Sequence, residues 1–175
     1  ADSILGSAGV SIGYATSSDG TNWTKDTGNP VLRKGSSAAW DEFGAGFSSV
    51  IKNGSNYEMW YTGARVVPDT LLGFFRQSIN LENALITGAN FAIGHDTSTN
   101  GISWTKDTSN PVVSKGSGAV WDKYGVGAAS VIKKGANFEM WYTGVASDAA
   151  GLLVDILDGK GFAEALRDST QMAIG

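Results

Sequence analysis

The side chains best suited to chemistry in this chain are its carboxylates, because an aspartate or glutamate can act as general acid, general base or nucleophile. Hydrolysis of a glycosidic bond uses two carboxylates in unequal roles. Carboxylates that recur at a fixed offset of 81 residues are expected to be scaffold: Asp26 and Asp107, Asp41 and Asp122, Glu58 and Glu139. Those without a counterpart include Glu42, Asp69, Asp96, Asp155 and Asp158. Asp96 is the most interesting of them, because it adjoins the only histidine, His95.

Tryptophans beside acidic side chains suggest a second kind of site, because sugar rings bind on aromatic faces. Trp60 and Trp141 stand in strands of alternating polarity and are predicted to be core residues. Trp40 and Trp121 each precede an aspartate near glycines and are better candidates for a surface platform. The candidate carbohydrate-binding residues are therefore Trp40, Asp41, His95, Asp96, Trp121 and Asp122, and no residue is assigned as catalytic.

Several classes of site and partner are not expected. One histidine and no cysteine cannot build a zinc site, and the Asp/Asn turns lack EF-hand spacing, so no metal is expected. Gly44-Ala45-Gly46 lacks the features of a phosphate loop, and no cofactor is expected. The net charge of −4 and the lack of a Lys/Arg run argue against nucleic acid. No apolar run reaches the roughly 18 residues that a membrane helix needs.

The elements that must position these residues come from a sequence written twice. Residues Ile12–Gly63 recur as Ile93–Gly144 without a gap, and 33 of the 52 positions are identical, which identifies an internal repeat. Each copy contains four short strand patterns, which are Val10–Thr16, Asn22–Lys25, Ser49–Lys52 and Tyr57–Thr62 in the first. Asp-Gly and Asn-Gly turns join the first two, because both tolerate positive φ. Four strands in about 50 residues predict one propeller-type blade.

The segments after each blade have a different composition, with apolar residues spaced as in amphipathic helices. The expected fold is therefore all-β with helical insertions and two β-propeller-type four-stranded blades. Repeat 1 spans 1–92, with its blade at 10–63 and its helical insert at 64–92. Repeat 2 spans 93–175, with its blade at 93–144, its insert at 145–171 and the start of a further strand at 172–175.

The order of motifs resembles a known family. Trp-Asp, Ser-Val-Ile-Lys-x-Gly, Met-Trp-Tyr-Thr-Gly, Ile-Gly-Tyr-Ala-Thr-Ser-x-Asp-Gly and Asn-Pro-Val-Leu resemble the repeat of secreted glycosidase-like five-bladed β-propellers related to glycoside hydrolase families 32, 43 and 130. The resemblance covers both copies and implies a carbohydrate ligand. It transfers no catalytic residue, because the family's catalytic Asp and Glu motifs have no clear counterpart here. The 29 residues between Trp-Tyr-Thr-Gly and Ile-Gly also depart from the family's short loop.

We expect an extracellular or cell-surface repeat module that self-assembles through its terminal strands and helical inserts. The partners are expected to be further copies, further repeats of a longer chain, or polysaccharide. The alternative is a carbohydrate-binding or glycoside-hydrolase-like propeller, or a fragment of one. The near-perfect periodicity argues against an enzyme. The candidate assembly residues are apolar and lie in the inserts and the last strand: Leu71, Leu72, Phe74, Phe75, Leu152, Leu153, Ile156, Leu157, Met172 and Ile174.

Overall fold

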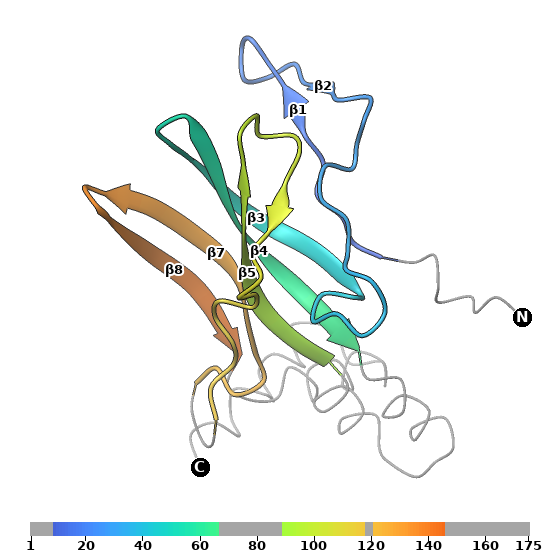
Figure 1. The fold of residues 1–175 in the computed structure, drawn as a ribbon, viewed down its shortest axis with the longest axis vertical. Helices are drawn as coiled ribbons and strands as arrows, with labels where there is room; N and C mark the ends of the chain where they lie inside the picture. The colour runs from blue at the N-terminus through green and yellow to red at the C-terminus, as the bar shows by residue number, and fades with distance from the viewer. Residues whose placement is uncertain (1–8, 67–88, 118–120, 146–175) are drawn as a thin grey trace, which may run out of the picture. The chain divides into compact units, whose positions relative to one another are not determined.

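The computed structural model describes residues 9–66, 89–117 and 121–145, and all regular structure in these ranges is β-strand (Figure 1). The expected all-β class is therefore confirmed for this part of the chain. The expected inserts lie mostly outside it, and where the first is described, at 64–66 and 89–92, it is strand rather than helix. The chain divides into two compact units. The first comprises Ala1–Arg65, Phe91–Ser114 and Val126–Thr143, and it holds most of the residues discussed below.

Two short hairpins have the same geometry at the repeat offset. β1 (Ala15–Thr16) pairs with β2 (Thr24–Lys25), and the C-terminal end of β5 (Ala89–Ser98) pairs with β6 (Thr105–Lys106). The partners are Ala15 with Lys25 in one hairpin and Asp96 with Lys106 in the other. The expected positive φ in the connecting turns is confirmed at Gly20 (75°) and Gly101 (74°).

The longer strands form two hairpins at the same offset. β3 (Gly44–Asn53) pairs with β4 (Asn56–Val66), and β7 (Gly125–Lys134) is followed by β8 (Asn137–Val145). In β3 the register shifts between Gly46 and Ser49, where one extra residue makes a β-bulge. Phe47 in this bulge has a φ of 48°, and its counterpart Ala128 has a φ of 49°.

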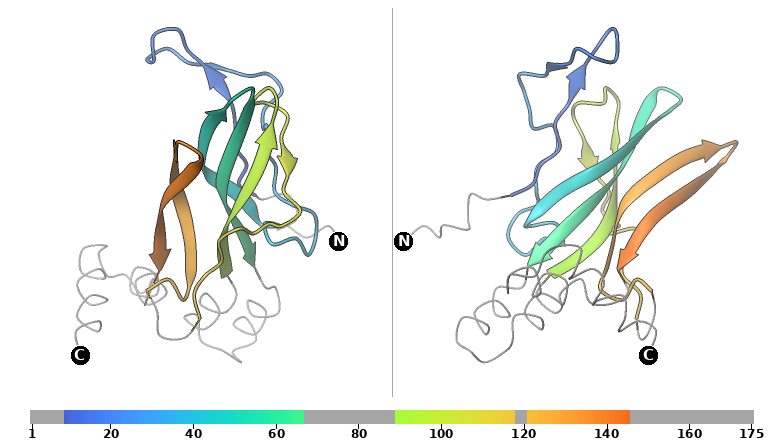
Figure 2. Two further views of the ribbon diagram at one scale, coloured as in Figure 1. Left: turned by 60° about the vertical axis from the view of Figure 1, so that its left-hand side comes forward. Right: turned by 180° about the vertical axis from the view of Figure 1, so that it is seen from behind.

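The strands do not group as the sequence suggested. The expected first blade, residues 10–63, combines β1 and β2 with β3 and β4, but β1 and β2 form a separate two-stranded sheet. The larger sheet has the order β3-β4-β5-β7-β8, with β6 paired to β5 (Figures 1 and 2). β4 and β5 are therefore neighbours although residues 67–88 separate them in sequence. Within the described residues, β8 is the last strand on this path.

Two apolar clusters cover the opposite faces of the β4–β5 pair, because successive side chains of a strand alternate between faces. Leu32, Ala45, Met59 and Tyr61 form one cluster, with Ile12, Trp40 and Trp104 packed against it. Trp60, Ile93, Val126, Ala129 and Val131 form the other. The chain before β3 thus packs on one face and β7 on the other.

The six tryptophans separate into two groups by exposure. Trp60 is 8% exposed, and Trp40 and Trp104 are partly buried. Their counterparts Trp141, Trp121 and Trp23 are 58%, 55% and 62% exposed. The expectation that Trp141 is a core residue is therefore wrong for the described residues. The covered group lies within residues 40–104, the stretch that contains β3 to β5 and ends just before β6, and the exposed group lies outside it.

Candidate functional site

The best-defined polar site is built around His95 and Asp96, which are neighbours on β5. Strand alternation sends their side chains to opposite faces of the sheet. Asn110 fixes the strand between them: its amide oxygen accepts from the His95 N–H at 2.6 Å, and its amide nitrogen donates to the His95 carbonyl at 2.9 Å. The same nitrogen donates to Asp96 Oδ1 at 3.1 Å. One side chain thus positions both candidate residues.

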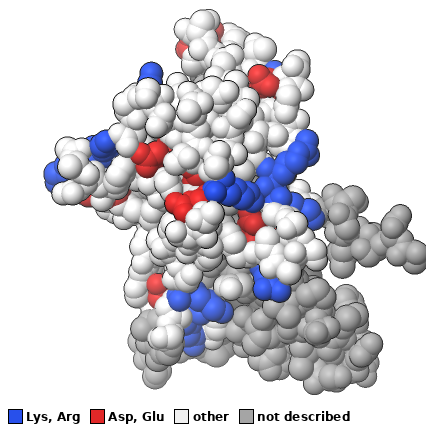
Figure 3. All heavy atoms as spheres, viewed as in Figure 1, with Lys and Arg blue, Asp and Glu red and all other residues white. Residues whose placement is uncertain are grey.

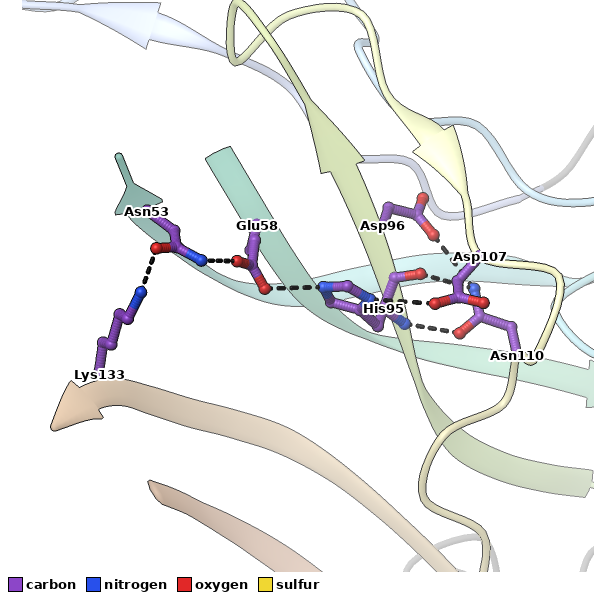
Figure 4. Close-up of polar contacts among 7 residues, drawn as sticks. All are labelled: Asn53, Glu58, His95, Asp96, Asp107, Asn110 and Lys133. Carbon is purple, nitrogen blue, oxygen red and sulfur yellow. Dashed lines mark hydrogen bonds and ion pairs between the residues drawn. The ribbon is translucent and has the colours of Figure 1, made fainter. Parts of the chain in front are cut away.

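On one face the His95 ring lies between two carboxylates (Figure 4). Nε2 lies 3.2 Å from Glu58 Oε2, and Nδ1 lies 3.3 Å from Asp107 Oδ2. A protonated ring donates to both carboxylates, whereas a neutral ring donates to only one. Trp60 flanks the imidazole at 4.9 Å between ring centroids. The ring is held on three sides, so its orientation is fixed.

The network continues past Glu58 toward β7. Glu58 accepts a short hydrogen bond from the Asn53 amide, and the Asn53 amide oxygen accepts from Lys133 Nζ (Figure 4). At the other end, the Ser109 backbone N–H and His95 lower the pKa of Asp107. The line of contacts joins strands β3, β4, β5 and β7 through side chains alone.

On the opposite face a buried carboxylate is paired with a lysine. Asp41 is 1% exposed, and its Oδ2 accepts from Tyr61 Oη at 3.2 Å and forms a close ion pair with Lys106. Burial, reinforced by the charges of Asp96 and Asp41, raises the pKa of Tyr61 well above its usual range. Tyr61 is therefore a neutral donor at physiological pH.

Asp96 is 0% exposed, and only its Oδ1 has a hydrogen-bond partner, so Oδ2 is buried without one. Burial raises the pKa of Asp96, Asn110 and Lys106 oppose that rise, and the charge of Asp41 adds to it. A carboxyl group in this position resists ionisation. Both carboxyls on this face are therefore closed off from solvent in this structure.

The predicted platform residues lie in two different environments. Trp40 crosses the sheet where glycines leave room: a Cβ on Gly94 would stand 2.6 Å from the indole, and one on Gly63 would overlap it. The Tyr61 ring lies against the indole in a tilted arrangement, with 5.5 Å between centroids. Trp40 is thus packed against the sheet and does not form an exposed platform. Trp121, in the second unit, lies against Gly144 in the same way, yet its side chain is exposed and Asp122 beside it is half-buried.

The sequence predicts three members of this site, His95, Asp96 and Asp41, and it misses five. Asp96 stands out because its counterpart is not acidic, and His95 because it is the only histidine. Glu58, Asp107, Tyr61, Lys106 and Asn110 complete the site. Recurrence at the 81-residue offset predicts a scaffold role for Glu58 and Asp107 instead. Strand register would have identified Lys106, which pairs directly with Asp96.

The remaining expectations concern the assembly residues, metal binding and membrane spans. All ten candidate assembly residues lie outside the described residues. In the part of the chain that the structure covers, no group of three His, Asp or Glu side chains could hold a metal ion, and no helix is long and apolar enough to cross a membrane. Acidic and basic side chains lie close together on the face shown in Figure 3.

No family model and no curated protein sequence matches the chain. Among the solved structures that resemble its fold are two with the same sequence identity. One is described as a glycoside hydrolase, with 21% identity and a TM-score of 0.51; the other is described as a complex of BT0996 and RGII, with 21% identity and a TM-score of 0.50. Each match covers 77% of this chain and 32% of the other, so the chain spans about a third of the length of these structures. The described part of the chain has a glycosidase-like fold.

Proposed function

We propose that the chain is a building module of a glycosidase-like β-propeller, whose blades are completed by pairing with equivalent modules. The observation that carries this proposal is the exposure of Trp23, Trp121 and Trp141 beside the burial of their counterparts. A large indole left in water forgoes several kcal/mol of burial free energy, at about 25 cal/mol per Å² of apolar surface. Contiguous exposed apolar surface marks an interaction site, and the paired strands β7 and β8 expose Ile132, Phe138 and Trp141.

The proposed complete blade is β3-β4-β5-β6. These strands are consecutive in the chain and adjacent in the sheet, and the segment 67–88 lies between the second and the third. The hairpin β1–β2 then supplies the last two strands of a neighbouring blade, and β7–β8 supplies the first two of another. The blade boundaries expected from the sequence are shifted by half a unit in this proposal.

This arrangement limits the possible assemblies. Each copy would contribute one complete blade and two complementary half-blades, so a closed ring of copies always has an even number of blades. Propellers have about 4–8 blades, which corresponds to rings of two, three or four copies. A head-to-tail contact whose rotation does not close gives an open fibre instead.

Light scattering on a sizing column tests the proposal. We expect a discrete mass two, three or four times that of the single chain. Trp141→Lys should give a folded single chain, because the residue is exposed and its loss leaves no cavity. Ile102→Lys, an exposed apolar residue in the turn of the proposed complete blade, is the matched control and should assemble normally. A single-chain mass for the native sequence at every concentration would contradict the proposal.

Carbohydrate binding is the second candidate, and an extracellular or cell-surface location belongs to the same proposal. Carbohydrate binding is favoured by the likeness to a glycoside hydrolase together with the exposed ring of Trp121 beside Asp122. Fold alone does not carry function, so binding must be tested directly. Retention on a panel of immobilised polysaccharides should fall for Trp121→Ala. Retention that is unchanged by Trp121→Ala would exclude this platform.

A further inference from the structure

We propose that β8 of one copy takes residues 10–16 of a second copy as its next strand, in the register in which β5 lies beside β4. This inference rests on the proposed function and names its partner and contact. The occupant is a second copy of this chain, because the chain itself contains both halves of the contact.

The first half of the contact is the open edge of β8. β4 and β8 share the sequence Glu-Met-Trp-Tyr-Thr-Gly at 58–63 and 139–144. β4 has β5 as its neighbour, whereas β8 ends the sheet path among the described strands (Figures 1 and 2). An edge strand presents unpaired backbone groups that can accept another strand. The strand that β4 already accepts shows which sequence fits there.

The second half is the segment Val10–Thr16, which corresponds to the part of β5 that ends at Thr97. It is already folded as β5 is: Tyr14 N–H donates to Asn29 Oδ1 at 2.6 Å, as His95 N–H donates to Asn110 at 2.6 Å. Ile12 bonds to Leu32 as Ile93 bonds to Val113. Because backbone groups of a strand alternate in direction, Gly13 and Ala15 face the other edge. No rearrangement of the hairpin is needed before it docks.

The side chains at this contact match in kind. Trp60 packs against His95 across β4 and β5. The counterparts of these two residues are Trp141 and Tyr14, so the second copy would place an aromatic ring on the exposed indole. Aromatic pairs contribute beyond the area that they bury.

The polar groups around Glu139 also fit this contact. Lys134 Nζ lies 3.0 Å from Glu139 Oε1, and Glu139 is the counterpart of the Glu58 that contacts His95. In the second copy the Tyr14 hydroxyl can donate to Glu139. Glu139 would then be contacted by Lys134 of its own copy and by Tyr14 of the second copy.

The absence of cysteine allows a direct test. Two single-cysteine proteins, Tyr14→Cys and Trp141→Cys, are mixed in equal amounts and treated with a short bis-maleimide. Each molecule carries one thiol, so any covalent dimer joins two copies. Thiols held in a fixed contact experience a millimolar effective concentration instead of a micromolar bulk one. We expect about a hundredfold more dimer than from the control pair Thr21→Cys and Trp141→Cys, and each variant alone should stay at the control level.

Light scattering of the native chain, run in parallel, separates this inference from the proposed function. If the native chain assembles and the 14/141 pair cross-links above the control, both stand. If the native chain assembles while the 14/141 pair cross-links no better than the control, the proposed strand register is wrong. The proposed function as a propeller module is then unaffected. If the native chain does not assemble at any concentration, both proposals fail. Circular dichroism of each variant confirms that it is folded, and light scattering shows whether it still assembles. Loss of assembly in Tyr14→Cys or Trp141→Cys, with Thr21→Cys assembling normally, would equally support the contact.

Discussion

The polar contacts on one face of the sheet converge on His95. It contacts a glutamate on β4, an aspartate after β6 and a tryptophan, and its backbone bonds to Asn110. A histidine that is the chain's only one, beside an unrepeated aspartate, could be identified from sequence. The two carboxylates around it could not, because repetition gave them the same weight as scaffold residues. Glu58 and Asp107 have counterparts in the other copy, but their environment differs because the residue between them is His95, whose counterpart is Tyr14.

Replacement of His95 tests whether the ring holds the two carboxylates in place. His95→Ala leaves Glu58 and Asp107 without their shared partner, and we expect a loss of about 1–3 kcal/mol in the free energy of unfolding. His95→Tyr, which copies Tyr14 of the other repeat, should lose less because a hydroxyl can still donate. Urea unfolding measures both. Equal losses in the two variants would mean that the tyrosine hydroxyl does not replace the contacts of the imidazole.

The buried Asp96 predicts a pH dependence of defined sign. Its pKa is raised in the folded chain, so its contribution to stability is fully present below the unfolded pKa of about 3.9 and is lost as pH rises through the folded pKa. The free energy of unfolding of Asp96→Asn, relative to the native chain, should therefore increase from pH 3 to pH 7.

Asp19 supplies the control for this prediction, since its sign is opposite. Backbone and side-chain hydrogen bonds, chiefly from Asn22, lower its pKa, so its stabilisation is present above the unfolded pKa and is lost as pH falls through the folded pKa. Asp19→Asn should therefore be most destabilising at pH 7 and least at pH 3. Parallel curves for the two variants would refute the assignment to individual carboxyls.

At the scale of the strands, two asparagines act as backbone partners. Asn29 bonds to the N–H and C=O of Tyr14, and Asn110 does the same for His95 while also bonding to Asp96. Each amide therefore continues the hairpin ladder where the chain has turned away. The sequence pattern predicted the strands and their turns, because alternation and Asx-Gly turns are local. It could not predict these amide contacts, because they span 15 residues.

Removal of these amides should affect the two hairpins unequally. Asn110→Ala breaks three hydrogen bonds around partly buried groups, and we expect a loss of about 2–4 kcal/mol in the free energy of unfolding. Asn29→Ala breaks two in a more exposed hairpin and should lose less. Thermal unfolding by circular dichroism ranks the two variants. A larger loss at Asn29 would show that the N-terminal hairpin carries more of the fold than its contacts indicate.

Glycines at equivalent places in the two hairpins provide a second comparison. Gly94→Ala places a methyl group within 2.6 Å of Trp40, so we expect overpacking to cost about 1–3 kcal/mol. At Gly13 the nearest side-chain atom to an added methyl is 3.5 Å away, on Asn29, so Gly13→Ala should fold normally. In the proposed register a tryptophan would lie on Gly13 as Trp40 lies on Gly94. Gly13→Ala should thus assemble poorly, and normal assembly of this variant would argue against the register.

At the scale of the whole molecule, the sequence established the repeat but not its phase. An 81-residue period has no marked origin, and the recurrence of Ile12–Gly63 predicts a unit that starts near Ile12. The pairing of β4 with β5 across residues 67–88 shows that the adjacency of strands follows a different frame. A long insertion between two paired strands hides their relation, since adjacency in sequence is the usual guide to strand pairing.

Assembly should also make stability depend on concentration. If copies bind one another only when folded, mass action raises the melting temperature as protein concentration rises. We expect this rise for the native chain and a constant melting temperature for Trp141→Lys. Differential scanning fluorimetry over a hundredfold range of concentration measures both. A constant melting temperature for the native chain would mean that the exposed tryptophans do not meet a second copy.

The uneven exposure of the six tryptophans makes the chain its own optical reporter. Indole emission shifts to shorter wavelength as water is removed from the ring, and half of the rings begin in contact with water. Binding of a second copy over either half-blade should therefore shift the tryptophan emission maximum to shorter wavelength, and no added label is needed to detect it. The buried half, anchored by Trp60 between His95 and Phe138, stays constant and serves as the internal reference.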